Sequence, residues 1–133
     1  MKKLLILFLL SFIFNACKKE ENVPNNINSS TPCSIEGRWN LTGFETNTMY
    51  VFDSTLRYTI YSNDGIFGTI DDAIPNPNSY TLADSILSID LSFGNYGIYS
   101  AEFKCDCNVV DLTQDDVVWK WWREGYDEIE CNE

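Results

Sequence analysis

From Cys33 onward, apolar and polar side chains alternate along a series of short segments that are separated by turn-forming residues. In one such segment, for example, Leu87, Ile89 and Leu91 alternate with polar side chains. In a strand, a period of two places every second side chain on the same face. One apolar face and one polar face are typical of an antiparallel sheet with one side toward water. Because no segment after Cys33 sustains the 3.6-residue period of a helix, the pattern predicts an all-β sandwich or barrel.

The alternation predicts eight strands that are joined mostly by short turns. Short connections between sequential strands favour an up-and-down meander, and closing the meander into a barrel removes its unpaired edges. We therefore expect an all-β fold, an antiparallel up-and-down eight-stranded barrel. The expected strands cover residues 35–44, 48–52, 56–61, 80–83, 86–91, 97–105, 108–112 and 117–123.

The third expected strand carries its apolar side chains on a single face. Leu56, Tyr58 and Ile60 share this face, whereas Arg57 and Thr59 share the other. Since the apolar face of a strand normally meets the core, we expect Tyr58 and its two neighbours to point into the barrel.

The stretch over residues 62–78 does not fit a strand, because it contains turn-forming residues such as Gly65, Pro75 and Pro77. Connections of this length inside a compact domain are usually lids or disordered segments. A ninth strand over residues 66–70 is the alternative. It is disfavoured because an up-and-down meander closes in antiparallel fashion only with an even number of strands.

The beginning of the chain has the pattern of an export signal. Two lysines precede an almost unbroken apolar run from Leu4 to Phe14. This run of eleven residues is shorter than the roughly 20 that a membrane-spanning helix needs, so it predicts a secretory signal. Asn15-Ala16-Cys17 follows and resembles the bacterial lipobox, which implies that Cys17 is acylated and becomes the new N-terminus. An ordinary signal peptide cut at another bond is the alternative.

These features predict three parts: a signal peptide over residues 1–16, the lipidated cysteine with a polar tether over residues 17–32, and the barrel over residues 33–133. Loss of the signal removes two lysines and no acid, which takes the net charge from −11 to −13. Anionic lipid repels such a body, so membrane attachment must come from acyl chains such as palmitate. Lys18-Lys19-Glu20-Glu21, directly after the cysteine, resembles the charged export tags of some Gram-negative surface lipoproteins, and a solubilising linker is the alternative. The resemblance implies a lipid-anchored protein of a Gram-negative outer membrane, on its periplasmic or surface face. The charge also argues against a nucleic-acid partner.

The composition also narrows the chemistry. The chain contains no histidine, which excludes Ser-His-Asp and Cys-His catalysis and histidine-ligated zinc. We expect no catalysis, no cofactor and no metal. Calcium binding or a glycosidase pair of carboxylates remains an alternative for the acidic connections, although solvated turn acids are commoner and the 12-residue calcium loop is missing. The acids concerned are Asp64, Asp71, Asp72, Asp115 and Asp116.

The first expected strand contains Gly37-Arg38-Trp39, and glycine inside a strand indicates a bend or a close approach. This Gly-x-Trp, in an eight-strand meander after a lipobox-like signal, resembles the lipocalin-like domains of Gram-negative surface lipoproteins. The resemblance covers roughly residues 33–125. It implies that a basic residue late in the barrel lies over Trp39 and seals the barrel floor, and Arg123 matches this position. It further implies a binding module rather than an enzyme.

Four cysteines besides Cys17 predict two disulfides in an exported chain. Cys105 and Cys107 are neighbours at i and i+2, too far apart and too parallel to pair with each other. One of them should therefore pair with Cys33 and the other with Cys131. In the eight-strand meander all four lie at the same end of the barrel. A redox-active Cys-x-Cys or a soft-metal site is the alternative.

The opposite end of the barrel is the candidate binding site, because the mouths of such barrels bind ligands. We expect a small apolar or amphipathic ligand, entering between the connections around Phe67 and Tyr96. In the alternative, a filled barrel binds a protein or glycan partner through its acidic connections or its outer face, where Trp122 is expected. The expected ligand-binding residues are Tyr58, Phe67, Tyr80, Tyr96, Tyr99 and Phe103.

Overall fold

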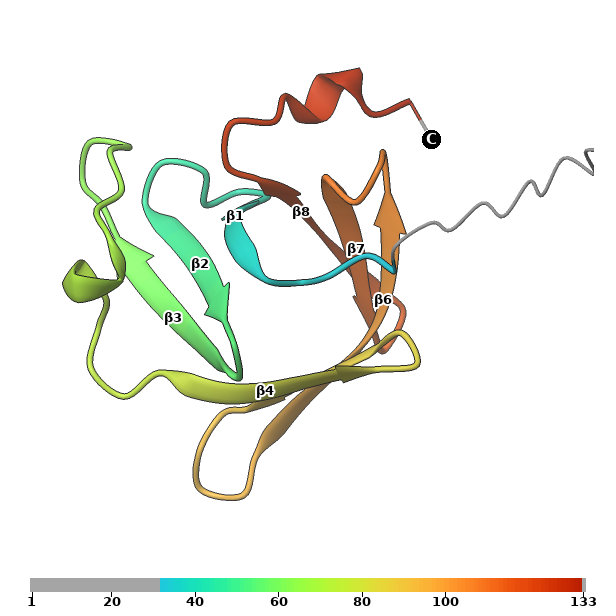
Figure 1. The fold of residues 1–133 in the computed structure, drawn as a ribbon, viewed down its shortest axis with the longest axis horizontal. Coiled ribbons are helices and arrows are strands. Elements are labelled where there is room, and N and C mark those ends of the chain that lie inside the picture. Colours follow the sequence, from blue (N-terminus) through green and yellow to red (C-terminus); the bar gives the residue numbers. More distant parts are fainter. Residues whose placement is uncertain (1–31, 133) are drawn as a thin grey trace, which may run out of the picture. The chain divides into compact units, whose positions relative to one another are not determined.

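The computed structural model describes residues 32–132, which form a closed barrel of eight antiparallel strands (Figure 1). Each strand pairs with the next one along the chain, and the last strand pairs with the first. The expected up-and-down eight-stranded barrel is thereby confirmed. The strands are β1 (Gly37–Leu41), β2 (Thr48–Asp53), β3 (Leu56–Tyr61), β4 (Asn78–Ala83), β5 (Ile86–Asp90), β6 (Tyr96–Lys104), β7 (Val109–Gln114) and β8 (Val117–Arg123), with short 3₁₀ helices η1 (Ile70–Asp72) and η2 (Glu128–Glu130) after β3 and β8.

The expected signal peptide and nearly all of the expected tether lie outside the described residues. Residues 32–132 contain no helix that is long and apolar enough to cross a membrane.

Two-residue turns explain why sequential strands pair. Asp84-Ser85 joins β4 to β5, and Asp115-Asp116 joins β7 to β8. All four residues have positive φ, between 49° and 65°. Two consecutive positive φ values define the hairpin turn whose twist matches that of the flanking strands, and aspartate tolerates this conformation better than most residues. The turns therefore favour hairpins at these places.

Because the strands alternate in direction, the barrel has two ends. We call the floor the end that carries the start of β1, the β6–β7 turn and the end of β8. We call the mouth the end that carries the connections over residues 42–47, 62–77 and 91–95.

A continuous cluster of buried side chains fills most of the barrel interior. At its centre, Phe52 meets Tyr80 edge-on with ring centroids 4.8 Å apart, and it lies 6.1 Å from the Trp121 ring. Each such aromatic pair contributes about 0.5–1.5 kcal/mol beyond its area burial. The cluster consists of Ile35, Trp39, Leu41, Phe52, Tyr80, Leu87, Ile89, Ala101, Val110, Leu112 and Trp121.

Strand β3 faces the opposite way from the sequence-based expectation. Arg57 pairs with Phe52, and Thr59 pairs with Tyr50. Because Phe52 and Tyr50 pack inside the barrel, Arg57 and Thr59 also point inward. The expectation that Tyr58 and its apolar neighbours point into the barrel was wrong.

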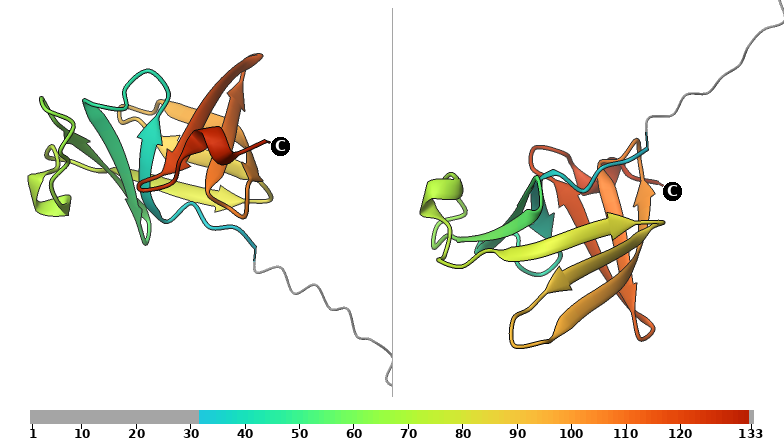
Figure 2. Two further views of the ribbon diagram at one scale, coloured as in Figure 1. Left: turned by 90° about the horizontal axis from the view of Figure 1, so that it is seen from above. Right: turned by 60° about the horizontal axis from the view of Figure 1, so that its bottom comes forward.

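The long connection over residues 62–77 explains this reversal. Phe67, Ile70 and Ala73 pack against the outward side chains of β2 and β3, so Tyr58 and the fully buried Ile60 are covered from outside the barrel. Figure 2 shows the connection beyond the ring of strands. It contains η1 and not a ninth strand. The apolar face of β3 thus has a core of its own and does not need the barrel interior.

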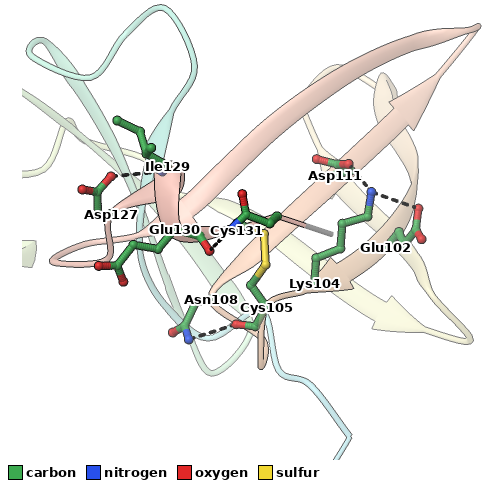
Figure 3. Close-up of a disulfide and its surroundings, with 10 residues drawn as sticks. Glu102, Lys104, Cys105, Asn108, Asp111, Asp127, Ile129, Glu130 and Cys131 are labelled. Atoms are coloured by element: carbon green, nitrogen blue, oxygen red, sulfur yellow. Dashed lines mark hydrogen bonds and ion pairs between the residues drawn. A yellow bond between two sulfur atoms is a disulfide. The ribbon is translucent and has the colours of Figure 1, made fainter.

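The disulfides join the cysteines as the two-bridge prediction required. Cys33 bonds to Cys107, and Cys105 bonds to Cys131. All four cysteines lie at the floor, so the expected pairing of one turn cysteine with each chain end is confirmed. Figure 3 shows the second bridge, which fastens the chain after β8 to the end of β6.

Trp122 lies on the outer face of β8, as expected, but it is only 7% exposed. Its strand partner Val109 is outward-facing and fully buried. We attribute this burial to the C-terminal segment, which the Cys105–Cys131 bridge holds beside this corner (Figures 1 and 3). Trp122 is therefore a packing residue and offers no free surface to a partner.

Candidate functional site

The floor is closed by Arg123 and Trp39. The guanidinium carbon of Arg123 lies 4.5 Å from the centroid of the Trp39 ring. Its three nitrogens donate to backbone carbonyl oxygens: Nε to Cys107 at 3.0 Å, Nη1 to Glu36 at 2.7 Å and Nη2 to Ser34 at 2.8 Å. Burial lowers the pKa of Arg123 from its usual value, yet an arginine stays charged at neutral pH. One side chain thus ties the start of the barrel to the β6–β7 turn.

Gly37 makes room for this arginine. A Cβ atom at this position would lie 2.5 Å from Arg123 Nη1, and the backbone φ of Gly37 is +123°. Both facts require glycine. The Gly-x-Trp of the sequence is therefore a packing motif in this chain. Gly37 leaves room for the guanidinium, and the ring of Trp39 packs against it.

The mouth contains an interior cavity of about 240 Å³. It lies between the end of β1, the inward side chains of β2, β3 and β6, and the middle of β8. Most of its lining is apolar or aromatic, and the guanidinium of the half-buried Arg57 faces it. The lining residues are Leu41, Thr42, Phe44, Tyr50, Arg57, Tyr99, Trp119, Lys120 and Trp121.

Arg57 is the charged group of this cavity. Its Nη2 donates to the Asn78 side-chain oxygen at 2.5 Å, and the Asn78 amide donates to the Asp90 carbonyl oxygen at 2.7 Å. The guanidinium carbon lies 4.4 Å from the centroid of the Tyr50 ring. The Nε is buried without a hydrogen-bond partner. Burial lowers the pKa of Arg57, yet the group remains charged.

The aromatic walls form two edge-on pairs. Tyr50 and Trp121 have ring centroids 5.2 Å apart, and Tyr99 and Trp119 have centroids 5.6 Å apart. Within residues 32–132 the hydroxyl groups of Tyr50 and Tyr99 make no hydrogen bond. The cavity thus combines flat apolar walls with two free hydroxyls and one guanidinium, which suits an amphipathic molecule with a hydrogen-bond acceptor.

The structure places the six expected ligand-binding residues in four environments. Tyr99 lines the cavity. Tyr80 and Phe103 point inward and pack in or against the core, where Tyr80 donates to the Ser54 carbonyl oxygen, and each also borders a hollow at the floor. Tyr96 is exposed on the outer face of β6, and Tyr58 and Phe67 pack together outside the barrel. The expected entrance between the connections around Phe67 and Tyr96 is corrected accordingly, since neither residue reaches the cavity.

Sequence reasoning missed Tyr50, Arg57 and Trp119 as lining residues. The second strand has large apolar residues at four consecutive positions. Alternation therefore could not show which of its side chains point into the barrel. Only an indirect signal pointed to Arg57. The apolar residues of the 62–77 connection can cover the apolar face of β3 from outside, which leaves the face with Arg57 to point inward.

Two of the acidic residues of the mouth, Asp64 and Asp72, stabilise their own turns. Asp64 accepts hydrogen bonds from the Ser62 hydroxyl at 2.9 Å and from the Ile66 amide at 3.0 Å, and these bonds lower its pKa. Asp72 accepts from the Thr69 amide at 2.8 Å and completes a capping box at η1. No group of three metal-ligating acidic or cysteine side chains occurs in the described part of the chain.

Two wider hollows lie at the floor, with volumes of about 520 and 480 Å³. Both are open clefts on either side of the segment over residues 32–36, and their lining includes Pro32 and Cys33. They have no unpaired buried cation and no aromatic cage. The mouth cavity is smaller, but it has aromatic walls and a guanidinium with an unpaired nitrogen, so we regard it as the candidate site.

Fold and site together define a disulfide-bonded, eight-stranded up-and-down barrel with a cross-linked floor and a small amphipathic cavity at its mouth. No protein-family model, no curated protein and no solved structure matches the chain.

Proposed function

We propose that this chain is an exported binding module that takes one small apolar or amphipathic molecule into the mouth cavity and performs no chemistry on it. The observation that carries the proposal is the cavity itself, about 240 Å³ of space lined by aromatic side chains and one guanidinium. An eight-stranded barrel has room either for its own side chains or for one small ligand. The lipocalin-like pattern of the sequence supports the same function.

Two tyrosines of β6 give a matched test of this proposal. Tyr99 lines the cavity, whereas Tyr96 is 58% exposed on the outer face. Titration calorimetry with a panel of small neutral and anionic aromatic compounds should detect binding to the wild type. Tyr99→Ala should weaken the binding at least about tenfold, and Tyr96→Ala should leave it unchanged. Equal affinities for the two variants would remove the cavity from the binding function.

We further propose that acylated Cys17 anchors the protein to the outer membrane of a Gram-negative bacterium. The lipobox-like sequence supports this proposal, and the acidic body leaves no polybasic route to an anionic surface. In a Gram-negative expression host, the wild type should fractionate with membranes. Cys17→Ser should be retained in its unprocessed form or released without acyl chains. A wild type recovered without acyl chains would contradict the anchor.

A further inference from the structure

The mouth cavity contains a charge that the protein does not neutralise. Arg57 has a buried Nε without an acceptor, and within residues 32–132 no carboxylate lies within ion-pair distance of its guanidinium. The other inward arginine, Arg123, by contrast, uses all three of its nitrogens on carbonyl oxygens. A buried cation without a partner is destabilising. Its retention beside a cavity indicates that the partner comes from outside.

We infer that the ligand of the mouth cavity is a small organic acid whose carboxylate pairs with Arg57. This inference rests on the proposed function, because it names the ligand class of the same cavity. Guanidinium and carboxylate match in shape and form short, charge-assisted hydrogen bonds. Of the three guanidinium nitrogens, Nη2 is used by Asn78 and Nε has no accessible surface, which leaves Nη1 as the donor for the first bond. The Tyr50 and Tyr99 hydroxyls can supply others.

The guanidinium is held in place before any ligand arrives. Asn78 accepts from Nη2, and its own amide is fixed by the Asp90 carbonyl oxygen. The Tyr50 ring supports one face of the guanidinium. Because these contacts limit the motion of Arg57, little ordering remains to oppose binding. Asn78 and Tyr50 are therefore positioning residues for Arg57.

Charge and volume define the rest of the ligand. Lys120 also borders the cavity, but it pairs across the strands with Asp111 on the outer face of β7, so its ammonium points away from the interior. The one inward guanidinium offers a single positive charge, which suits a monoanion better than a dianionic phosphate. An apolar cavity of about 150 Å³ is enough to hold benzene, so the volume of about 240 Å³ has room for a body of one ring. The rings of Tyr99, Trp119 and Trp121 provide flat apolar walls for such a body. A one-ring carboxylic acid, such as an arylacetate, fits both limits.

The test compares phenylacetate with phenylacetamide, which has the same shape but no charge. Titration calorimetry with the wild type should show at least about tenfold tighter binding of the acid. Arg57→Met should abolish this preference while retaining binding of the amide, and Arg57→Lys should keep part of it. Because the preference is a ratio measured within one variant, a general loss of stability does not imitate the result. Arg38→Met is the matched control, since Arg38 lies on the outer face, paired with Glu124.

The outcomes separate the ligand class from the binding function. Equal binding of acid and amide to the wild type, or an unchanged preference in Arg57→Met, would overturn the inference and leave the binding module standing. A wild type that binds neither probe would overturn the inference and count against the proposed function as well. Loss of the preference for the acid in Arg57→Met, with the preference kept in Arg38→Met, supports both the ligand class and the binding function.

Discussion

At the scale of single residues, Gly37 and Arg123 form the most specific contact in the barrel. We predict that Gly37→Ala lowers the free energy of unfolding by at least about 2 kcal/mol, because the new Cβ meets Arg123 Nη1 and the positive φ is strained. Gly94→Ala is the control, since Gly94 also has positive φ but nothing within 4 Å of its Cβ position. Its cost should be about 1 kcal/mol. Urea unfolding measures both, and equal losses would show that the contact with Arg123 is unimportant.

Tyr80 should make stability depend on pH under alkaline conditions. Burial, followed by the charges of Glu36 and Asp53, raises the pKa of its phenol in the folded state. A raised folded pKa means that the stabilisation is complete below the unfolded pKa of about 10 and is lost as pH rises through the folded value. Tyr80→Phe should therefore flatten the fall of stability above about pH 10. An unchanged slope in Tyr80→Phe would show that other groups cause the fall.

At the scale of elements, the 62–77 connection acts as an outer cover of β2 and β3. We predict that Phe67→Ala lowers stability by about 1–2 kcal/mol, less than the 3–5 kcal/mol typical of a fully buried phenylalanine. Ligand affinity should not change, because Phe67 packs outside the barrel. Chemical unfolding and calorimetry check the two halves of this prediction. A strong loss of affinity without loss of stability would restore the original expectation that Phe67 lies at the site.

The C-terminal segment is a second outer cover, and it depends on one bridge. Cys105 and Cys131 close a loop with a sequence separation of 26, and removing such a bridge costs about 3 kcal/mol. We predict that the double variant Cys105→Ser/Cys131→Ser also exposes Trp122, which shifts the tryptophan emission to longer wavelength. An unchanged emission spectrum in the folded variant would show that other residues bury Trp122.

These two covers explain which parts of the structure the sequence could predict. Short turns and alternation were sufficient for the strand order, because they act locally. In β3, alternation correctly grouped Tyr58 with Ile60 but could not tell inside from outside. That choice depended on a third layer, the packing of residues 62–77, which is a tertiary effect. The inward position of Arg57 follows from the same tertiary effect. Alternation along the chain therefore could not predict this residue or the other missed residues of the cavity lining.

At the scale of the whole molecule, the two ends of the barrel are built differently. Two disulfides, the buried Trp39 and the three carbonyl bonds of Arg123 hold the floor closed. The mouth retains a cavity and an unpaired cation. The four cysteines could be placed at one end from the strand count alone. The cavity could not, because its volume depends on how large side chains from five strands share the interior.

The four tryptophans provide the most direct test of the central claim that the mouth cavity binds a ligand. Trp119 and Trp121 line the cavity, whereas Trp39 lies at the floor and Trp122 is buried on the outer face of β8. The measurement is a phenylacetate titration followed by the indole N–H signals in proton–nitrogen correlation spectra. We predict saturable shifts of the Trp119 and Trp121 signals with those of Trp39 and Trp122 nearly unmoved. Saturation without movement of Trp119 and Trp121, or no saturable shift at all, would contradict the account.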